Sequence, residues 1–275
     1  MTVERLLIEA KKKVHSDYAK MIISDMLNIN SLELFNYLND EKDENFCNTY
    51  FSKIEMIANN KPVQYVIGNV NFYGLNLEVN DKVLIPRFET EELVENTLNL
   101  IKEHFDNDKL DIIDLGCGSG VIGLTLEQKV STNSVDLIDI SENALEVTKI
   151  NKDNLNSKAN LIQSDMFENI TKKYDVIISN PPYIKTTEEI EDIVLNNEPH
   201  LALFAGVDGL DCYKKIINNL SNHMKDRCLV AFEIGMTQAQ DITNIAKEVL
   251  GNIKIEVKKD LSDKDRMLFI FKNLE

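Results

Sequence analysis

The feature that most constrains this chain is a glycine-rich segment, residues 112–123, which reads IIDLGCGSGVIG. Its first two isoleucines are β-branched and apolar, as expected of a strand buried on both faces of a parallel sheet. The alternating glycines allow backbone angles that are closed to other residues, and they let a ligand approach the main chain. The apolar run that follows would begin a helix whose free N–H groups face the turn. The segment therefore predicts a strand, a ligand-binding turn and a helix of an α/β fold.

Two cofactors could occupy such a turn, and Asp114 distinguishes between them. The spacing from Gly118 to Gly123 satisfies the dinucleotide fingerprint, and Asp139 lies near the expected distance for a carboxylate that binds ribose. The alternative is a loop for S-adenosylmethionine (SAM). A carboxylate at position 114 would repel a pyrophosphate about 5 Å away by roughly 3 kcal/mol at an effective dielectric near 20. The same carboxylate favours the ammonium and sulfonium groups of SAM, so the sequence favours SAM. A tight turn without a ligand is the third interpretation.

Strand-like and helix-like segments alternate from residue 110 onward, which predicts a mostly parallel, seven-stranded sheet. The expected strands lie near residues 110–115, 134–139, 159–163, 174–179, 227–233, 252–257 and 266–272. In such sheets, ligands gather at the carboxyl ends of the strands. Four polar residues fall at or just beyond these ends, namely Asp114, Asp139, Asp165 and Asn180.

Three of the expected cofactor contacts follow from this placement. Asp139 can accept hydrogen bonds from both ribose hydroxyls. Asp165 could accept from the exocyclic amine of adenine, while Met166 and Phe167 offer apolar surface beside the ring. The alternative for this segment is a turn aspartate followed by two core residues. Cys117 is expected to be a small residue that fits the glycine loop, not a nucleophile.

A second motif, Asn180, Pro181, Pro182 and Tyr183, follows the apolar run at residues 176–179. The prolines fix φ and stiffen the backbone. The Asn180 side-chain carbonyl and the Pro181 main-chain carbonyl could hold both hydrogens of a planar NH₂ group, and Tyr183 could stack on it. Proximity can supply on the order of 7–11 kcal/mol, and no histidine lies nearby in sequence, so we assign no general base. The alternative is a strand-ending turn with a purely structural role.

Composition excludes several classes of protein. The chain has 275 residues, of which 43% are hydrophobic, enough for one large domain or two smaller ones. Its formal net charge of −16 argues against nucleic acid as the main partner, because phosphates are neutralised by Lys and Arg. No apolar run is long enough for a membrane span, and the N-terminus lacks the core of a signal peptide. The four scattered cysteines have no metal-ligand spacing, which indicates a cytoplasmic protein without a metal.

The region before the glycine loop divides into three parts. Residues 1–62 are expected to form a small helical bundle, with helices from Val3, from a cap at Ser16, from a cap at Ser31, and over about 46–58. Residues 63–84 are expected to be a linker that contains a β-hairpin around Gly74. Residues 85–275 then form the SAM-binding domain. Within it, residues 85–91 are either a capped helix start or a lid that contacts the cofactor. Two histidines are expected at the surface, His200 and His223.

Taken together, these motifs resemble the HemK/PrmC-type protein-glutamine N5-methyltransferases, which act on peptide chain release factors. The resemblance covers nearly the whole chain. Residues 164–167 look like the adenine-side segment of that family, Asp139 like its ribose carboxylate and residues 180–183 like its substrate-amide motif. Its SAM loop is matched by Asp114, Leu115, Gly116, Cys117, Gly118, Ser119 and Gly120. More specific matches are residues 85–91, 197–199, 206–210, 233–235 and 259–261. Departures are Phe88 for a usual Pro, Asn197 for a common Tyr and Met166 for a frequent aromatic residue.

The resemblance implies a Rossmann-like class I SAM-dependent methyltransferase domain, preceded in the sequence by a helical domain that docks the substrate. The implied reaction transfers a methyl group from SAM to the side-chain nitrogen N5 of the glutamine in the Gly-Gly-Gln (GGQ) motif of a release factor. A cytoplasmic monomer is expected, with no membrane or nucleic acid as main partner. The alternatives are a methyltransferase of exocyclic amines in nucleic acids (adenine N6 or guanine N2), a non-catalytic SAM-binding protein, and a nicotinamide oxidoreductase, which Asp114 disfavours.

Overall fold

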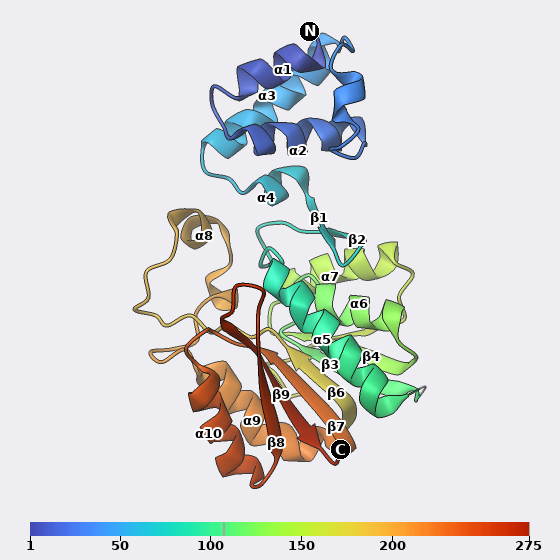
Figure 1. Cartoon of the computed structure of the whole chain (residues 1–275), viewed down its shortest axis with the longest axis vertical. Helices are drawn as coiled ribbons and strands as arrows, with labels where there is room; N and C mark the ends of the chain where they lie inside the picture. Colours follow the sequence, from blue (N-terminus) through green and yellow to red (C-terminus); the bar gives the residue numbers. More distant parts are fainter. Residues whose placement is uncertain (107, 275) are drawn as a thin grey trace. The chain divides into compact units, whose positions relative to one another are not determined.

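The structure is a computed structural model that describes residues 1–106 and 108–274. The chain divides into two compact units (Figure 1). The first unit holds residues 1–69 together with 191–197, and the second holds residues 70–190 together with 198–275.

The first unit is a bundle of short helices around its own apolar core. Its elements are α1 (Val3–Ala10), α2 (Ser16–Leu27), the 3-10 turn η1 (Leu34–Tyr37), α3 (Glu44–Ala58), α4 (Val63–Ile67) and α8 (Asp192–Asn197). Helix α3 begins where Asp43 caps it, because this carboxylate accepts a hydrogen bond from the backbone N–H of Phe46 at 2.8 Å. Inside the core, the Tyr50 hydroxyl donates to the carbonyl of Ala19 at 3.1 Å. The unit is thus packed in the way its apolar periodicity predicts.

Two local expectations for this unit were wrong. The helix expected after Ser31 is only the 3-10 turn η1, and the side chain of Leu32 is 90% exposed. That segment lacks the continuous apolar face that stabilises a longer helix in a protein. Helix α2 does begin at Ser16, but His15 occupies the cap position, where its ring Nδ1 accepts from the backbone N–H of Asp17.

The start of the expected linker is also helical. Pro62 stands at the N-cap of α4, and Gly68, with a φ of +97°, ends this helix after five residues. Val63 and Val66 lie on one face of α4 and are buried in the bundle core. The sequence predicted only a linker with a hairpin over residues 63–84, and the packing of these two valines explains why the linker begins with a helix instead. The hairpin itself follows as β1 (Asn69–Phe72) and β2 (Leu75–Glu78).

The second unit is built on a sheet that contains seven strands within the described residues. They are β3 (Leu110–Leu115), β4 (Thr132–Asp139), β5 (Asn160–Gln163), β6 (Tyr174–Ser179), β7 (Met224–Glu233), β8 (Lys254–Lys259) and β9 (Asp265–Lys272). The spatial order is β5-β4-β3-β6-β7-β9-β8, parallel from β5 to β7 and antiparallel on both sides of β9. The expected mostly parallel α/β sheet is confirmed.

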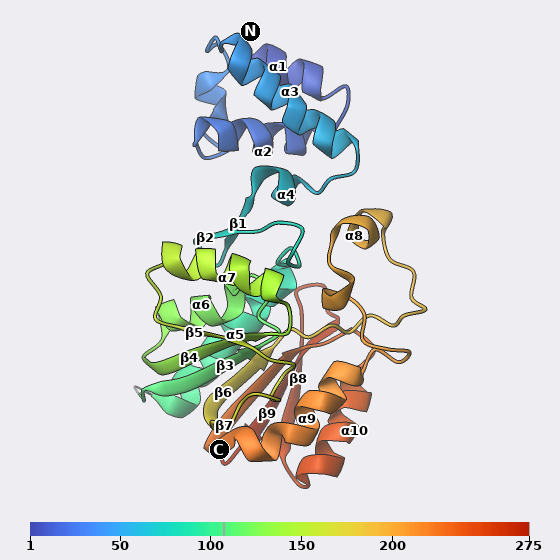
Figure 2. The same cartoon turned by 180° about the vertical axis from the view of Figure 1, so that it is seen from behind.

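Helices cover both faces of this sheet (Figures 1 and 2). One face carries α5 (Phe88–Phe105), α6 (Val121–Lys129) and α7 (Glu142–Asn154), and the other carries α9 (Asp211–His223) and α10 (Ala239–Leu250). Neighbouring residues of β3 alternate between two cores, with Ile112 in the core beneath α5 and α6 and Ile113 in the core beneath α9. Burial on both faces explains why the strands read as continuous apolar runs. No helix among residues 1–106 and 108–274 is both long and apolar enough to cross a membrane.

The close packing of α6 on the sheet predicts a stability effect at Gly123. A Cβ atom there would lie 2.2 Å from Cδ2 of Leu137 and 3.1 Å from Cβ of Asp114. We expect Gly123→Ala to lower the free energy of unfolding in urea by about 1–3 kcal/mol, because overpacking a dense core forces side chains and backbone to shift. The control Gln128→Ala, on the exposed side of the same helix, should have little effect. Equal stability of both variants would contradict this packing argument.

Candidate active site

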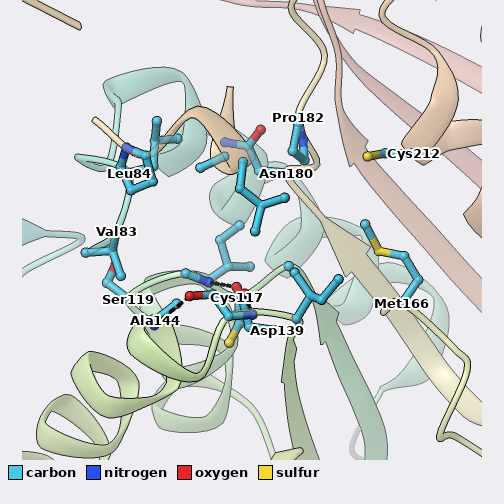
Figure 3. A pocket seen from close by; sticks show the side chains of 18 of the residues that line it. Val83, Leu84, Cys117, Ser119, Asp139, Ala144, Met166, Asn180, Pro182 and Cys212 are labelled. Carbon is cyan, nitrogen blue, oxygen red and sulfur yellow. Dashed lines mark hydrogen bonds between the residues drawn. The ribbon is translucent and has the colours of Figure 1, made fainter. Parts of the chain in front are cut away.

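A cavity of about 370 Å³ lies where β3, β4 and β6 end, a volume in the range of small-molecule sites (Figure 3). The glycine loop between β3 and α6 forms one wall, and the segment after β6 forms another. The structure thus brings together polar residues that the sequence placed at separate strand ends. The expected site residues that line the cavity are Gly116, Cys117, Gly118, Ser119, Asp139, Asp165, Met166, Asn180 and Pro182.

The glycines of the loop serve two different purposes. Gly116 and Gly118 have φ angles of +71° and +57°, and a Cβ atom on either would meet no atom within 4 Å. Their positive φ angles favour glycine, and the open space before them leaves the main chain accessible to a ligand. At Gly120, by contrast, a Cβ atom would lie 2.7 Å from Cγ2 of Thr148. This third glycine permits close packing between the loop and α7.

Asp139 connects the glycine loop to β4. Its Oδ2 accepts a hydrogen bond from the backbone N–H of Gly118 at 2.9 Å, and its Oδ1 accepts from the N–H of Ser141 at 2.8 Å. Burial raises the pKa of this carboxyl, although the backbone hydrogen bonds oppose the shift. A carboxylate offers about four acceptor sites, so Asp139 can accept a further hydrogen bond from a hydroxyl in the cavity. This arrangement fits a ribose.

Asp114 lies beneath the loop and is fully buried. Its Oδ2 accepts from the backbone N–H of Gly123 at 2.9 Å, whereas its Oδ1 has no hydrogen-bond partner among the described residues. Burial raises the pKa of this carboxyl to about 7, and the negative charge of Asp139 adds to the shift. A buried carboxylate oxygen without a partner is suited to a cationic ligand. Asp114 itself is not part of the cavity wall, so it would favour a cationic ligand such as SAM by its charge and not by direct contact.

The adenine-side segment contributes only part of what the sequence predicts. Asp165 and Met166 line the cavity, and Oδ2 of Asp165 forms an ion pair with Nζ of Lys215 at 2.6 Å. Phe167 is 4% exposed and stacks on the ring of His223 with the centroids 4.2 Å apart, so it is a core residue and not a wall of the cavity. The expected surface position of His223 was wrong as well, because this ring is buried beside Phe167.

Only half of the second motif, residues 180–183, faces the cavity, and the other half supports the turn behind it. Asn180 and Pro182 line the cavity, whereas Pro181 and Tyr183 do not. The Tyr183 hydroxyl donates to Oε1 of Glu233 at 3.3 Å. The Tyr183 carbonyl accepts from Nε2 of Gln238 at 3.0 Å. Within this cavity, Tyr183 thus supports the turn and does not offer a stacking surface.

Sequence reasoning missed three residues that shape the site. Thr90, at the start of α5, lines the cavity and donates to Oε2 of Glu233 at 2.6 Å. Glu198 accepts from the backbone N–H of Ile85 at 3.1 Å and pairs with Arg87 at 2.5 Å. The segment from residue 85 is therefore both a helix start and a wall of the cavity. The only signal for Glu198 and Glu233 was their place in two of the family-specific segments.

Comparisons with known proteins agree with this geometry. The family described as Methyltransferase small domain matches residues 89–199. The release factor glutamine methyltransferase of Bacillus cereus is 34% identical over 255 residues, covering 91% of this chain and 90% of its own length. The enzyme of that name from Streptococcus pneumoniae is 41% identical over 218 residues, covering 78% and 77%. A solved methyltransferase from Pyrococcus furiosus shares the fold, with a TM-score of 0.52, 20% identity and coverage of 74% of this chain and 91% of its own.

The raised pKa of Asp114 predicts how stability depends on pH. This pKa, about 7, lies above the usual value near 4, so between these two pH values the folded state holds a proton that the unfolded state has released. The contribution of Asp114 to the free energy of unfolding is therefore present at low pH and lost as the pH rises through about 7. Asp114→Asn removes this titration.

Urea denaturation from about pH 5 to 8 should show a smaller loss of stability for Asp114→Asn than for the natural protein. Other buried carboxyls titrate in both proteins, so the difference between the two slopes isolates Asp114. The control Asp226→Asn, at an exposed position, should retain the slope of the natural protein. An identical slope for Asp114→Asn and the natural protein would contradict the prediction.

Proposed function

We propose that this chain, which belongs to the release factor glutamine methyltransferase family, transfers a methyl group from SAM to the side-chain amide nitrogen N5 of a release-factor glutamine, the one in the GGQ motif. The observation that carries the proposal is the position of Asn180. Its side chain lies on the wall of the same cavity that the glycine loop and Asp139 line. An amide-binding group and a set of SAM-binding groups thus face one space.

The cofactor side of the proposal assigns a task to each carboxylate. Bound SAM supplies a methyl group on a positively charged sulfur. Asp139 would bind the ribose hydroxyls, and the charge of buried Asp114 would favour the cationic part of the ligand. Asp165, which the Lys215 ammonium holds at 2.6 Å, would accept from the adenine amine beside Met166. Gly116 and Gly118 would let the ligand approach the main chain, and Gly120 would let the loop pack closely on α7.

The substrate side rests on two acceptors. The Asn180 side-chain carbonyl and the Pro181 main-chain carbonyl would each accept one hydrogen of the glutamine NH₂ group. Such hydrogen bonds strengthen as the nitrogen becomes more positive during the transfer, so they stabilise the transition state more than the ground state. Orientation of the nitrogen toward the methyl group is the main effect that these residues provide. We assign no general base.

The N-terminal helices are the proposed docking surface for the release factor. The proposal treats residues 1–62 as the docking domain, 63–84 as the linker region and 85–275 as the methyltransferase domain. The net charge of −16 supports a protein substrate with a basic surface over a polynucleotide. A cytoplasmic monomer that acts without a metal completes the proposal.

The test is methyl transfer from labelled SAM to purified, unmodified release factor, with duplex DNA and ribosomal RNA in parallel. We expect label on the release factor, which mass spectrometry of its peptides should locate on the GGQ glutamine. Label only on nucleic acid would replace this function with amine methylation of DNA or RNA. No label on any substrate, despite SAM binding in a calorimeter, would point to the non-catalytic alternative.

Asn180→Ala should separate chemistry from cofactor binding. The variant loses one of the two acceptors for the amide hydrogens, so we expect the rate of methyl transfer to fall roughly 10²-fold or more. SAM affinity in titration calorimetry should change little, because the ribose and adenine contacts remain. Asn154→Ala, at an exposed position on α7, is the control and should retain full activity. An equal loss of SAM affinity would instead assign Asn180 to the cofactor.

A further inference from the structure

A buried chain of hydrogen bonds runs from the end of β7 to the cavity. Glu233, the last residue of β7, is 1% exposed, and its Oε2 accepts from the Thr90 hydroxyl at 2.6 Å. Oγ1 of Thr90 in turn accepts from Nδ2 of Asn180 at 3.2 Å. Figure 3 shows Asn180 beside Pro182 on the wall of the cavity. The chain joins three elements, because Thr90 lies in α5 and Asn180 follows β6.

The direction of this chain follows from the chemistry of its members. An ionised carboxylate can only accept hydrogen bonds, so the single hydroxyl hydrogen of Thr90 must point to Glu233. The Thr90 oxygen is then an acceptor toward Asn180, and only the NH₂ group of Asn180 can satisfy it. The two ends of an asparagine amide have nearly the same shape, so packing alone does not choose between them. The negative charge at Glu233 makes the choice.

We propose that Glu233 is a positioning residue that acts through Thr90 to turn the side-chain amide of Asn180. In this orientation the carbonyl oxygen of Asn180, and not its NH₂ group, is available to the amide nitrogen of the substrate. The inference rests on the proposed function, in which this oxygen accepts a hydrogen of the glutamine. If the side-chain amide of Asn180 were reversed, its NH₂ group would face the NH₂ group of the substrate glutamine. The substrate would then lose one of its two hydrogen-bond acceptors.

The surroundings of Glu233 place its ionisation near neutral pH. Burial raises its pKa to about 7 and the negative charge of Glu89 adds to the shift, whereas the hydrogen bonds from Thr90 and Tyr183 and the positive charge of Arg266 oppose it. Nη1 of Arg266 donates to the carbonyl of Ile234 at 3.2 Å, which holds the guanidinium close to the end of β7. Above neutral pH the carboxylate orients Thr90. Protonated Glu233 can donate to Thr90 instead, which frees the hydroxyl hydrogen to meet the carbonyl of Asn180.

Glu233→Gln tests this role because it replaces the carboxylate with an amide that can donate to Thr90. We expect kcat to fall roughly 10²-fold, as for a misplaced reacting group, while the dissociation constant for SAM stays close to that of the natural protein. Thr90→Val, which has nearly the same shape but no hydroxyl, should behave alike, and Thr90→Ser should restore most of the activity. Glu127→Gln, toward the far end of α6, is the matched control and should retain full activity.

The pH profile distinguishes orientation from a merely structural role. In the natural protein, kcat should fall as the pH drops through about 7, because Glu233 becomes protonated. In Glu233→Gln, kcat should stay low and the acidic limb should shrink to the part that Asp114, whose pKa is also about 7, contributes in both proteins. The same acidic limb in both proteins would overturn the proposal, as would full activity of Glu233→Gln.

A second measurement does not depend on activity. In NMR spectra of the isotope-labelled protein, assigned with the variant Asn180→Asp, the side-chain NH₂ protons of Asn180 should show a nuclear Overhauser contact to the Thr90 methyl group. Glu233→Gln should weaken this contact, because the amide turns. An unchanged contact in the folded variant overturns the orienting role, whereas a failure of the natural protein to methylate release factor overturns only the proposed function.

Discussion

Two buried carboxylates hold the glycine loop, and the cavity depends on them. Asp114 at the end of β3 accepts from the N–H of Gly123, and Asp139 at the end of β4 accepts from the N–H of Gly118. The loop is thereby fixed to two neighbouring strands, with its main chain open toward the cavity. Hydrogen bonds between backbone donors and carboxylates are stronger than neutral ones, which suits groups that burial alone would destabilise. Together with the hydrogen bond from the N–H of Cys117 to the carbonyl of Ile138 at 2.8 Å, these two contacts fix the glycine loop on this side of the cavity.

The opposite side of the cavity is fixed by residues that are far apart in the sequence. Nε2 of Gln238 bridges the carbonyls of Gly209 and Tyr183, at 3.1 and 3.0 Å, and a Cβ atom on Gly209 would lie 2.4 Å from the Tyr183 carbonyl oxygen. Asp260 in turn accepts from Nε of Arg266 at 3.2 Å, close to the end of β7. The segments at residues 206–210 and 233–235 thus both brace the turn that carries Asn180, whereas Asp260 holds Arg266 beside the end of β7.

The hydrophobic pattern of the sequence predicted the fold better than it predicted the side chains that line the cavity. The central strands were predictable because each contains an apolar run that is buried on both faces, and the glycine loop was predictable because its backbone angles disfavour other residues. The bond between Thr90 and Glu233 joins positions 143 residues apart, and no local pattern reports such a pairing. The sequence analysis expected Phe167 beside the adenine ring, because an apolar side chain near a strand end can face either the ligand or the core and no local pattern distinguishes the two. The stack of Phe167 on His223 settles which.

The charges around the cavity also explain which ligands it rejects. Asp114, Asp139 and Glu233 are all buried near the loop or at the end of β7, and burial raises the pKa of each. One cation on the wall, Lys215, is engaged by Asp165 and also by Glu168, at 2.7 Å. A pyrophosphate would therefore meet the carboxylates of Asp139 and Asp165 on the cavity wall, with Lys215 already engaged, whereas a cationic ligand is attracted to them. The charged side chains around the cavity therefore favour SAM over a dinucleotide, as Asp114 does by itself in the sequence.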